Sequence, residues 1–147
     1  MKTMRIGIVG QGFVGSAIYE GLKESYQIKT YDIDESKCNS RHSEVCHWAD
    51  VIFVCLPTPM KKSGECDISI LQQAILRIDY IVQERKTRPI VVIKSTEIWS
   101  VGKPESMISC LQFLDHIEVV VHESPKHTVT DRLRFNSVVK RCDLFGP

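Results

Sequence analysis

Three glycines near the start of the chain have the spacing of a phosphate-binding loop, in the form Gly10-Gln11-Gly12-Phe13-Val14-Gly15. In this GxGxxG pattern Gly10 permits a tight turn, Gly12 lets the backbone approach a diphosphate, and Gly15 lets a helix pack closely on a strand. The free N–H groups of the first helical turn, which includes Phe13 and Val14, would hold the phosphates. The loop therefore predicts a dinucleotide site.

An acidic residue follows at the distance that such a site requires. Asp32 lies 22 positions after Gly10, at the end of an alternating run, residues 27–33, that predicts a second strand. A carboxylate there accepts hydrogen bonds from ribose hydroxyls and repels a 2′-phosphate, which favours NAD over NADP. Asp34 is an alternative ribose ligand further into the loop, and Lys37 would weaken the preference for NAD.

The elements that must position these residues alternate along the chain. Residues 4–9 predict a strand and residues 14–26, with apolar side chains every four positions, an amphipathic helix. Alternating strands and helices indicate βαβ units in a doubly wound, mainly parallel α/β sheet of the Rossmann type, and we expect one domain over residues 1–147. The later expected elements are a short helix or turn at 36–48, strands at 49–56, 89–94 and 117–122, helices at 68–83 (N-cap Asp67) and 104–114, and a short strand at 142–145.

Two further motifs carry a family resemblance. Residues 49–59 contain a buried strand that ends in Pro57-Thr58-Pro59, and a later strand ends in Lys94-Ser95-Thr96. With the glycine loop, they resemble the N-terminal NAD-binding domain of the UDP-glucose/GDP-mannose dehydrogenase family. The resemblance implies that Pro57, Thr58, Pro59, Ser95 and Thr96 bind the cofactor, NAD, and that Thr96 lies near the nicotinamide and the reacting water, in a catalytic role.

Beyond Thr96 the chain departs from the family pattern. Ser124-Pro125 matches a family motif, but Lys126 and Thr130 stand where the family has glutamates. The family's substrate domain, with its catalytic cysteine, has no counterpart in the 147 residues, so we expect it to be absent. The sequence thus predicts the NAD-binding domain of a nucleotide-sugar 6-dehydrogenase, truncated or completed by another chain. The alternatives are a non-catalytic dinucleotide sensor and a dehydrogenase of the broader β-hydroxyacid type.

Composition narrows the class of protein. The chain is 43% hydrophobic and 25% charged, with a net charge of +1, so it has neither the composition of a disordered protein nor the basic character of a nucleic-acid-binding one. No apolar run approaches the ~20 residues of a membrane span, and the first residues do not form a signal peptide. The six cysteines form no CxxC pair, as expected of reduced thiols in a cytoplasmic protein. Cys55, in an apolar run, is interpreted as a small buried hydrophobe.

Other reactive side chains are given structural interpretations. Cys38, His42 and Cys46 recur every four residues, but one short helix makes a poor tetrahedral cage, so no metal site is predicted. His122 and His127 are interpreted as loop histidines rather than general bases. The expected partners are a dinucleotide, a nucleotide sugar together with a partner chain, and a second copy of this chain, with neither nucleic acid nor membrane among them.

Overall fold

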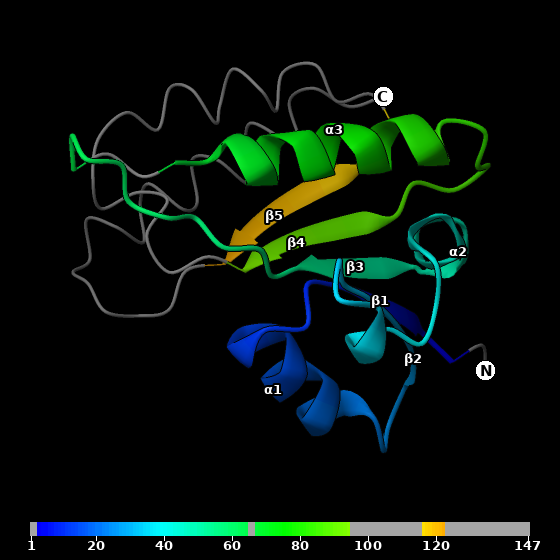
Figure 1. The fold of residues 1–147 in the computed structure, drawn as a ribbon. Coiled ribbons are helices and arrows are strands. Elements are labelled where there is room, and N and C mark those ends of the chain that lie inside the picture. Colours follow the sequence, from blue (N-terminus) through cyan, green and yellow to red (C-terminus); the bar gives the residue numbers. More distant parts are fainter. Residues whose placement is uncertain (1–2, 65–66, 95–115, 123–147) are drawn as a thin grey trace, which may run out of the picture.

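The structure, a computed structural model, describes residues 3–64, 67–94 and 116–122 (Figure 1). Within these residues five parallel strands form one sheet in the order β2-β1-β3-β4-β5. The chain crosses from β2 over β1 to β3, so the strand order reverses beside β1, as in doubly wound sheets. The predicted α/β class with a parallel sheet is confirmed. The strands are β1 (Arg5–Val9), β2 (Gln27–Tyr31), β3 (Val51–Val54), β4 (Ile90–Lys94) and β5 (Glu118–His122).

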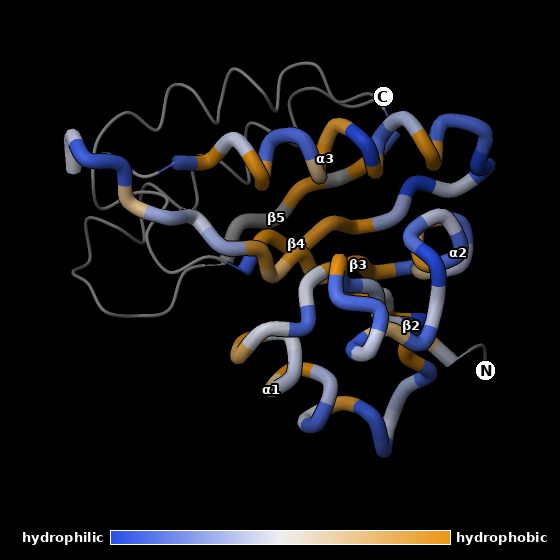
Figure 2. Tube along the Cα trace, viewed as in Figure 1, coloured by the Kyte–Doolittle hydropathy of each residue, from blue (hydrophilic) through white to orange (hydrophobic). Residues whose placement is uncertain are grey.

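The described helices lie on both faces of the sheet. Helix α1 (Phe13–Leu22) lies on one side, and α3 (Ser69–Val82) lies on the other (Figure 1). The short α2 (His42–Trp48) packs on the α3 side, where Gly7 makes room: a Cβ on Gly7 would lie 2.5 Å from Val45 Cγ1. Figure 2 shows apolar residues concentrated on the strands and on the inner side of α3. The core between the sheet and α2/α3 includes Val45, Ile52, Val54, Ile75, Ile78, Val91 and Ile93.

Several elements are shorter than the sequence pattern indicates. Helix α1 ends at Leu22 rather than at residue 26, and β3 is limited to Val51–Val54. The segment 36–48 divides into a 3₁₀ turn, η1 (Glu35–Lys37), and α2. The N-cap of α3 is Ile68, not the predicted Asp67, although the Asp67 carboxylate accepts the Ser69 N–H at 3.0 Å. The expected elements at 104–114 and 142–145 lie outside the described residues.

In the described parts of the chain, the outer edge of β2 is covered by the Asn39 side chain and the backbone around it, and no described strand pairs with it. Asn39 Oδ1 accepts the Thr30 N–H at 2.8 Å, and the Asn39 Nδ2 group donates to the Ile28 carbonyl at 3.4 Å. The backbone N–H groups of Asn39 and Ser40 donate to the Thr30 carbonyl. The connection from β2 to β3 therefore satisfies the Thr30 N–H and the Thr30 and Ile28 carbonyls at this edge.

A salt bridge and charged hydrogen bonds connect the segments near the amino-terminal ends of the strands. Arg5 at the start of β1 forms a salt bridge with Asp50, with Nη2 2.8 Å from Oδ1. Arg85, after α3, donates to the carbonyls of Cys46 and Ala49 at 2.8 and 2.7 Å, which satisfies the end of α2. No helix in the described parts of the chain is long and apolar enough to cross a membrane.

Candidate functional site

The glycine loop makes a turn that a side chain would block. Gly10 has φ +96°, a left-handed conformation that favours glycine, and its N–H donates to the Tyr31 carbonyl at 2.8 Å. A Cβ on Gly10 would overlap the backbone carbonyl of Cys55. The turn is therefore wedged between the ends of β2 and β3, and it directs the chain into α1.

Gly12 and Gly15 have different surroundings at the start of α1. A Cβ on Gly15 would overlap the Gly10 carbonyl oxygen, so this glycine allows the helix to pack against the turn. A Cβ on Gly12, the N-cap of α1, would meet no atom within 4 Å. Gly12 has no side chain to cap α1, and the first-turn N–H groups, which have no partner within a helix, adjoin this open space. This is the arrangement that accepts a phosphate.

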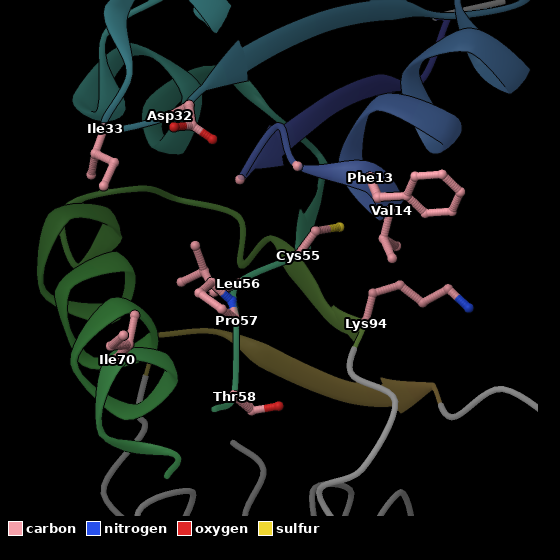
Figure 3. Close-up of a pocket in the computed structure, with 12 residues that line it drawn as sticks. Phe13, Val14, Asp32, Ile33, Cys55, Leu56, Pro57, Thr58, Ile70 and Lys94 are labelled. Carbon is pink, nitrogen blue, oxygen red and sulfur yellow. The ribbon is translucent and has the colours of Figure 1, made fainter. Parts of the chain in front are cut away.

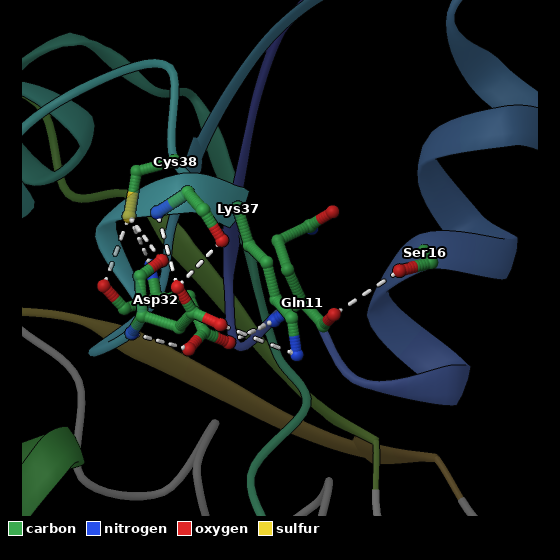
Figure 4. Close-up of polar contacts among 7 residues, drawn as sticks. Gln11, Ser16, Asp32, Lys37 and Cys38 are labelled. Carbon is green, nitrogen blue, oxygen red and sulfur yellow. Dashed lines mark hydrogen bonds and ion pairs between the residues drawn. The ribbon is translucent and has the colours of Figure 1, made fainter.

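Asp32 links the glycine loop to the turn after β2 (Figure 4). Its Oδ2 accepts the Gln11 N–H at 2.6 Å and its Oδ1 accepts the Asp34 N–H at 2.9 Å. These two bonds end β2 at Tyr31 instead of at residue 33 and fix the direction of the carboxylate. Each carboxylate oxygen keeps a further acceptor position for a ligand hydroxyl.

The other polar residues of this turn are engaged locally. Asp34, the alternative ribose ligand, accepts hydrogen bonds from the N–H and hydroxyl of Ser36, which hold the pKa of its carboxyl below the usual value. Lys37 Nζ lies 3.8 Å from the Asp34 carboxylate. Neither residue lines the cavity beside Asp32, whereas Asp32 itself does.

A cavity of about 590 Å³ runs along the carboxyl ends of the strands (Figure 3). At one end it is bounded by Asp32 and Ile33 and at the other end by Thr58 and Lys94, and Ile70 in the first turn of α3 lies on the side of Leu56 and Pro57. Seven of the residues that the sequence singled out line it: Gly10, Gly12, Phe13, Val14, Asp32, Pro57 and Thr58. The glycine loop and the Pro-Thr-Pro segment are thus brought to a single cavity, although more than forty residues separate them in the sequence.

Two other predicted site residues, Gly15 and Pro59, are not among the described residues that line the cavity. Gly15 packs beneath the turn, and Pro59 closes the following loop, its carbonyl accepting the Asp67 N–H at 2.7 Å. Ser95, Thr96 and His127 lie outside the described residues.

Five further residues line the cavity and are not predicted by the sequence motifs. The additional lining residues are Ile33, Cys55, Leu56, Ile70 and Lys94. The interpretation of Cys55 as a buried core residue was wrong: it is half-buried and faces the cavity, because it follows β3 at the edge of the sheet. Burial raises the pKa of its thiol to about 12, so the group is protonated at neutral pH. The sequence signal for these residues is their position at the carboxyl ends of predicted parallel strands, since Cys55 follows β3 and Lys94 ends β4.

The periodic cysteine and histidine residues separate in the fold. Cys46 Sγ lies 3.8 Å from His42 Nδ1 in the core, and burial raises the pKa of the Cys46 thiol to about 12. Cys38 instead exchanges hydrogen bonds with the backbone of Asp32, 2.9 Å from both its N and O atoms (Figure 4). In the described ranges no group of three or more His, Cys, Asp or Glu side chains is arranged to hold a metal ion. His122 ends β5.

Comparison with known proteins identifies the family. The model of the NAD binding domain of the UDP-glucose/GDP-mannose dehydrogenase family matches residues 37–128. The chain belongs to this family. The expected resemblance is thereby confirmed, and a dinucleotide is the cofactor that this family domain takes.

Relatives of this UDP-glucose/GDP-mannose dehydrogenase family member are much longer than the chain. GDP-mannose 6-dehydrogenase of Pseudomonas savastanoi pv. phaseolicola is 26% identical over 97 residues, which cover 65% of this chain and 22% of that protein. An uncharacterized protein of Methanocaldococcus jannaschii is 28% identical over 122 residues, covering 63% of this chain and 14% of that protein. The chain thus spans less than a quarter of these curated relatives.

Two solved structures share the fold of the family domain. A UDP-glucose dehydrogenase from Pyrobaculum islandicum superposes with a TM-score of 0.64 at 15% identity, covering 86% of this chain and 36% of that one. A GDP-mannose dehydrogenase from Pseudomonas aeruginosa, in a ternary complex, gives 0.63 at 17% identity, covering 97% and 44%. The second overlap covers nearly the whole chain and so extends beyond residues 37–128, the segment matched by the family model.

Proposed function

We propose that the chain binds NAD in the cavity at the carboxyl edge of its sheet and supplies the cofactor half of a nucleotide-sugar dehydrogenase. The observation that carries this proposal is the open space over Gly12, beside the uncapped start of α1 and next to Asp32. A diphosphate against Gly12 would accept hydrogen bonds from the N–H groups in the first turn of α1, around Phe13 and Val14. The adjoining ribose then reaches the Asp32 carboxylate.

The apolar walls suit the two ends of the cofactor. Two cavity-lining side chains, Ile33 beside Asp32 and Ile70 on α3, are 93% and 45% exposed in the absence of a ligand. Both would be covered by an adenine ring placed between them, at a gain of about 25 cal/mol for each Å² of apolar surface removed from water. The nicotinamide end would lie toward Thr58 and Lys94.

Asp32 also provides the basis for choosing NAD. Its carboxylate is held by the Gln11 and Asp34 N–H groups and cannot turn away from the cavity without breaking both bonds. A 2′-phosphate would therefore meet a fixed negative charge. We expect NADP to bind at least tenfold more weakly than NAD.

NAD, when bound, supplies a hydride acceptor, and the chain's residues bind and orient it. By the family resemblance, Thr96 is placed near the nicotinamide, and the thiol that retains the oxidised substrate belongs to a further domain. We therefore propose that the chain acts as a dehydrogenase only together with that domain, in the same protein or in another chain. A nucleotide sugar is the proposed substrate of that assembly.

Isothermal titration calorimetry with NAD and with NADP tests this function. We expect one NAD site per chain, weaker NADP binding, and no NADH formation from UDP-glucose or GDP-mannose by the chain alone. Absence of NAD binding to the folded chain would refute the cofactor site. NADH formation by the isolated chain would refute the requirement for a second domain.

A non-catalytic dinucleotide sensor is the second candidate, favoured by Lys126 and Thr130 at positions where the family has glutamates. Addition of a family substrate domain in trans separates the two candidates. Activity restored by the unmodified chain supports the divided enzyme. Activity restored only after Lys126→Glu and Thr130→Glu supports the sensor.

A further inference from the structure

The cavity has one charged side chain at each end. Of the described residues that line it, only Asp32 and Lys94 carry a formal charge at neutral pH. Asp32 follows β2 and Lys94 ends β4, and the sheet order places β1 and β3 between them. Three strand spacings of about 4.8 Å separate the two positions by roughly 14 Å, a distance that an extended dinucleotide can span.

This polarity assigns the two ends of the cofactor. The acidic end suits the adenosine ribose, whose hydroxyls donate hydrogen bonds to a carboxylate. The nicotinamide end consequently lies near Lys94. Figure 3 shows the Lys94 side chain extended along the cavity beside Val14, on the same side as the Cys55 thiol.

We propose that the Lys94 ammonium group lets the site discriminate between the two redox states of its cofactor, favouring the reduced form. The proposal rests on the proposed NAD site. The oxidised nicotinamide ring carries a positive charge and the reduced ring is neutral, so an ammonium group nearby repels only the oxidised form. The rest of the dinucleotide is the same in both forms, and every other contact cancels in the ratio of their affinities.

The surroundings of Lys94 allow its charge to act inside the cavity. Lys94 is half-buried, and the adjoining walls are formed by apolar side chains such as Val14 and Leu56. The charge on Lys94 also acts on the Cys55 thiol: burial raises the pKa of that thiol, and Lys94 opposes the rise. Two like charges a few ångströms apart in such a setting change an equilibrium constant about tenfold.

Titration of four proteins with NAD⁺ and with NADH tests the proposal. In Lys94→Met we expect the ratio of NAD⁺ to NADH affinity to rise about tenfold over that of the unmodified chain. Lys94→Arg keeps the charge and should leave the ratio within about twofold. Lys86→Met is the matched control. It removes an exposed lysine between α3 and β4, at the opposite edge of the sheet, and should leave the ratio of NAD⁺ to NADH affinity unchanged.

The outcomes separate this proposal from the one on which it rests. If Lys94→Met weakens both forms equally, Lys94 contacts the diphosphate, and the redox proposal fails while the NAD site stands. An unchanged ratio in Lys94→Met also overturns it. If the unmodified folded chain binds neither form, the NAD site itself fails. Should Lys94→Met not fold, the salt dependence of the unmodified chain decides: screening at 0.5 M salt should raise the ratio, and a constant ratio contradicts the proposal.

Discussion

Substitution of glycine by alanine should weaken cofactor binding at one position of the loop, Gly12, and lower the stability of the fold at another, Gly15. Gly12→Ala adds a methyl group where no atom lies within 4 Å, at a backbone conformation of φ −74° and ψ −156° that alanine adopts freely. The N-cap preference for glycine over alanine and the lower entropy of the unfolded alanine chain nearly cancel. We expect the free energy of unfolding to change by less than about 1 kcal/mol.

Cofactor binding should nevertheless fall sharply in Gly12→Ala. The methyl group would occupy the space of the diphosphate and hold it away from the N–H groups of α1. The loss of one charge-assisted hydrogen bond costs about 1.5–3 kcal/mol, which is roughly a 10- to 100-fold weaker Kd for NAD.

Gly15→Ala is the matched variant. Its methyl group would overlap the Gly10 carbonyl oxygen, so the start of α1 must shift, at a cost of about 1–3 kcal/mol in unfolding free energy. Urea unfolding and calorimetry with NAD measure both quantities in both variants. NAD affinity within twofold of the unmodified value in a folded Gly12→Ala chain would show that no diphosphate lies against Gly12.

Three further changes have defined outcomes. Asp32→Asn keeps an acceptor for the Gln11 N–H but removes the negative charge. Calorimetry should therefore show NAD affinity about tenfold lower and a smaller difference between the affinities for NAD and NADP. An unchanged difference would exclude Asp32 as the discriminating residue. Arg85→Met leaves the carbonyls of Cys46 and Ala49 without their charged donor, so urea unfolding should show an unfolding free energy lower by about 1–2 kcal/mol, with NAD affinity unchanged. The control Arg88→Met, at an exposed position, should change neither quantity. Burial, and secondarily the charge of Arg77, lowers the pKa of His42 from 6.5 to about 4, so its contribution to stability is complete above pH 6.5 and is lost as the pH falls toward 4. The free energy of unfolding should therefore fall by about 2 kcal/mol from pH 7.5 to pH 5 through this group, and the fall should be correspondingly smaller in His42→Phe. An equal pH dependence of the unfolding free energy in the two proteins would contradict a buried neutral imidazole.

The parts of the site that follow from local chemistry were accessible from the sequence. Glycine spacing predicts the turn at Gly10 because only glycine tolerates its positive φ and its contact with Cys55. Apolar runs predict the parallel strands because both faces of the sheet need cover. The functions of Ser95 and Thr96, which rest on the family resemblance, remain predictions.

The parts that depend on tertiary contacts were not accessible in this way. The alternating pattern continues through Ile33, but β2 ends at Tyr31, since the Asp32 carboxylate binds the Gln11 N–H across the sheet edge. Ile33 is left 93% exposed at the cavity. Composition alone likewise cannot separate a core cysteine from one at a strand end: Cys46 is fully buried and Cys55 faces the site.

The way in which Asn39 closes β2 affects how this protein behaves at high concentration. A terminal strand whose N–H and C=O groups are free can recruit a strand from another molecule and so start ordered aggregation. Here one amide side chain and two neighbouring N–H groups already occupy the Thr30 and Ile28 positions where an incoming strand would bond. These hydrogen bonds therefore oppose fibril-like growth at the centre of β2, on the outer side of the sheet.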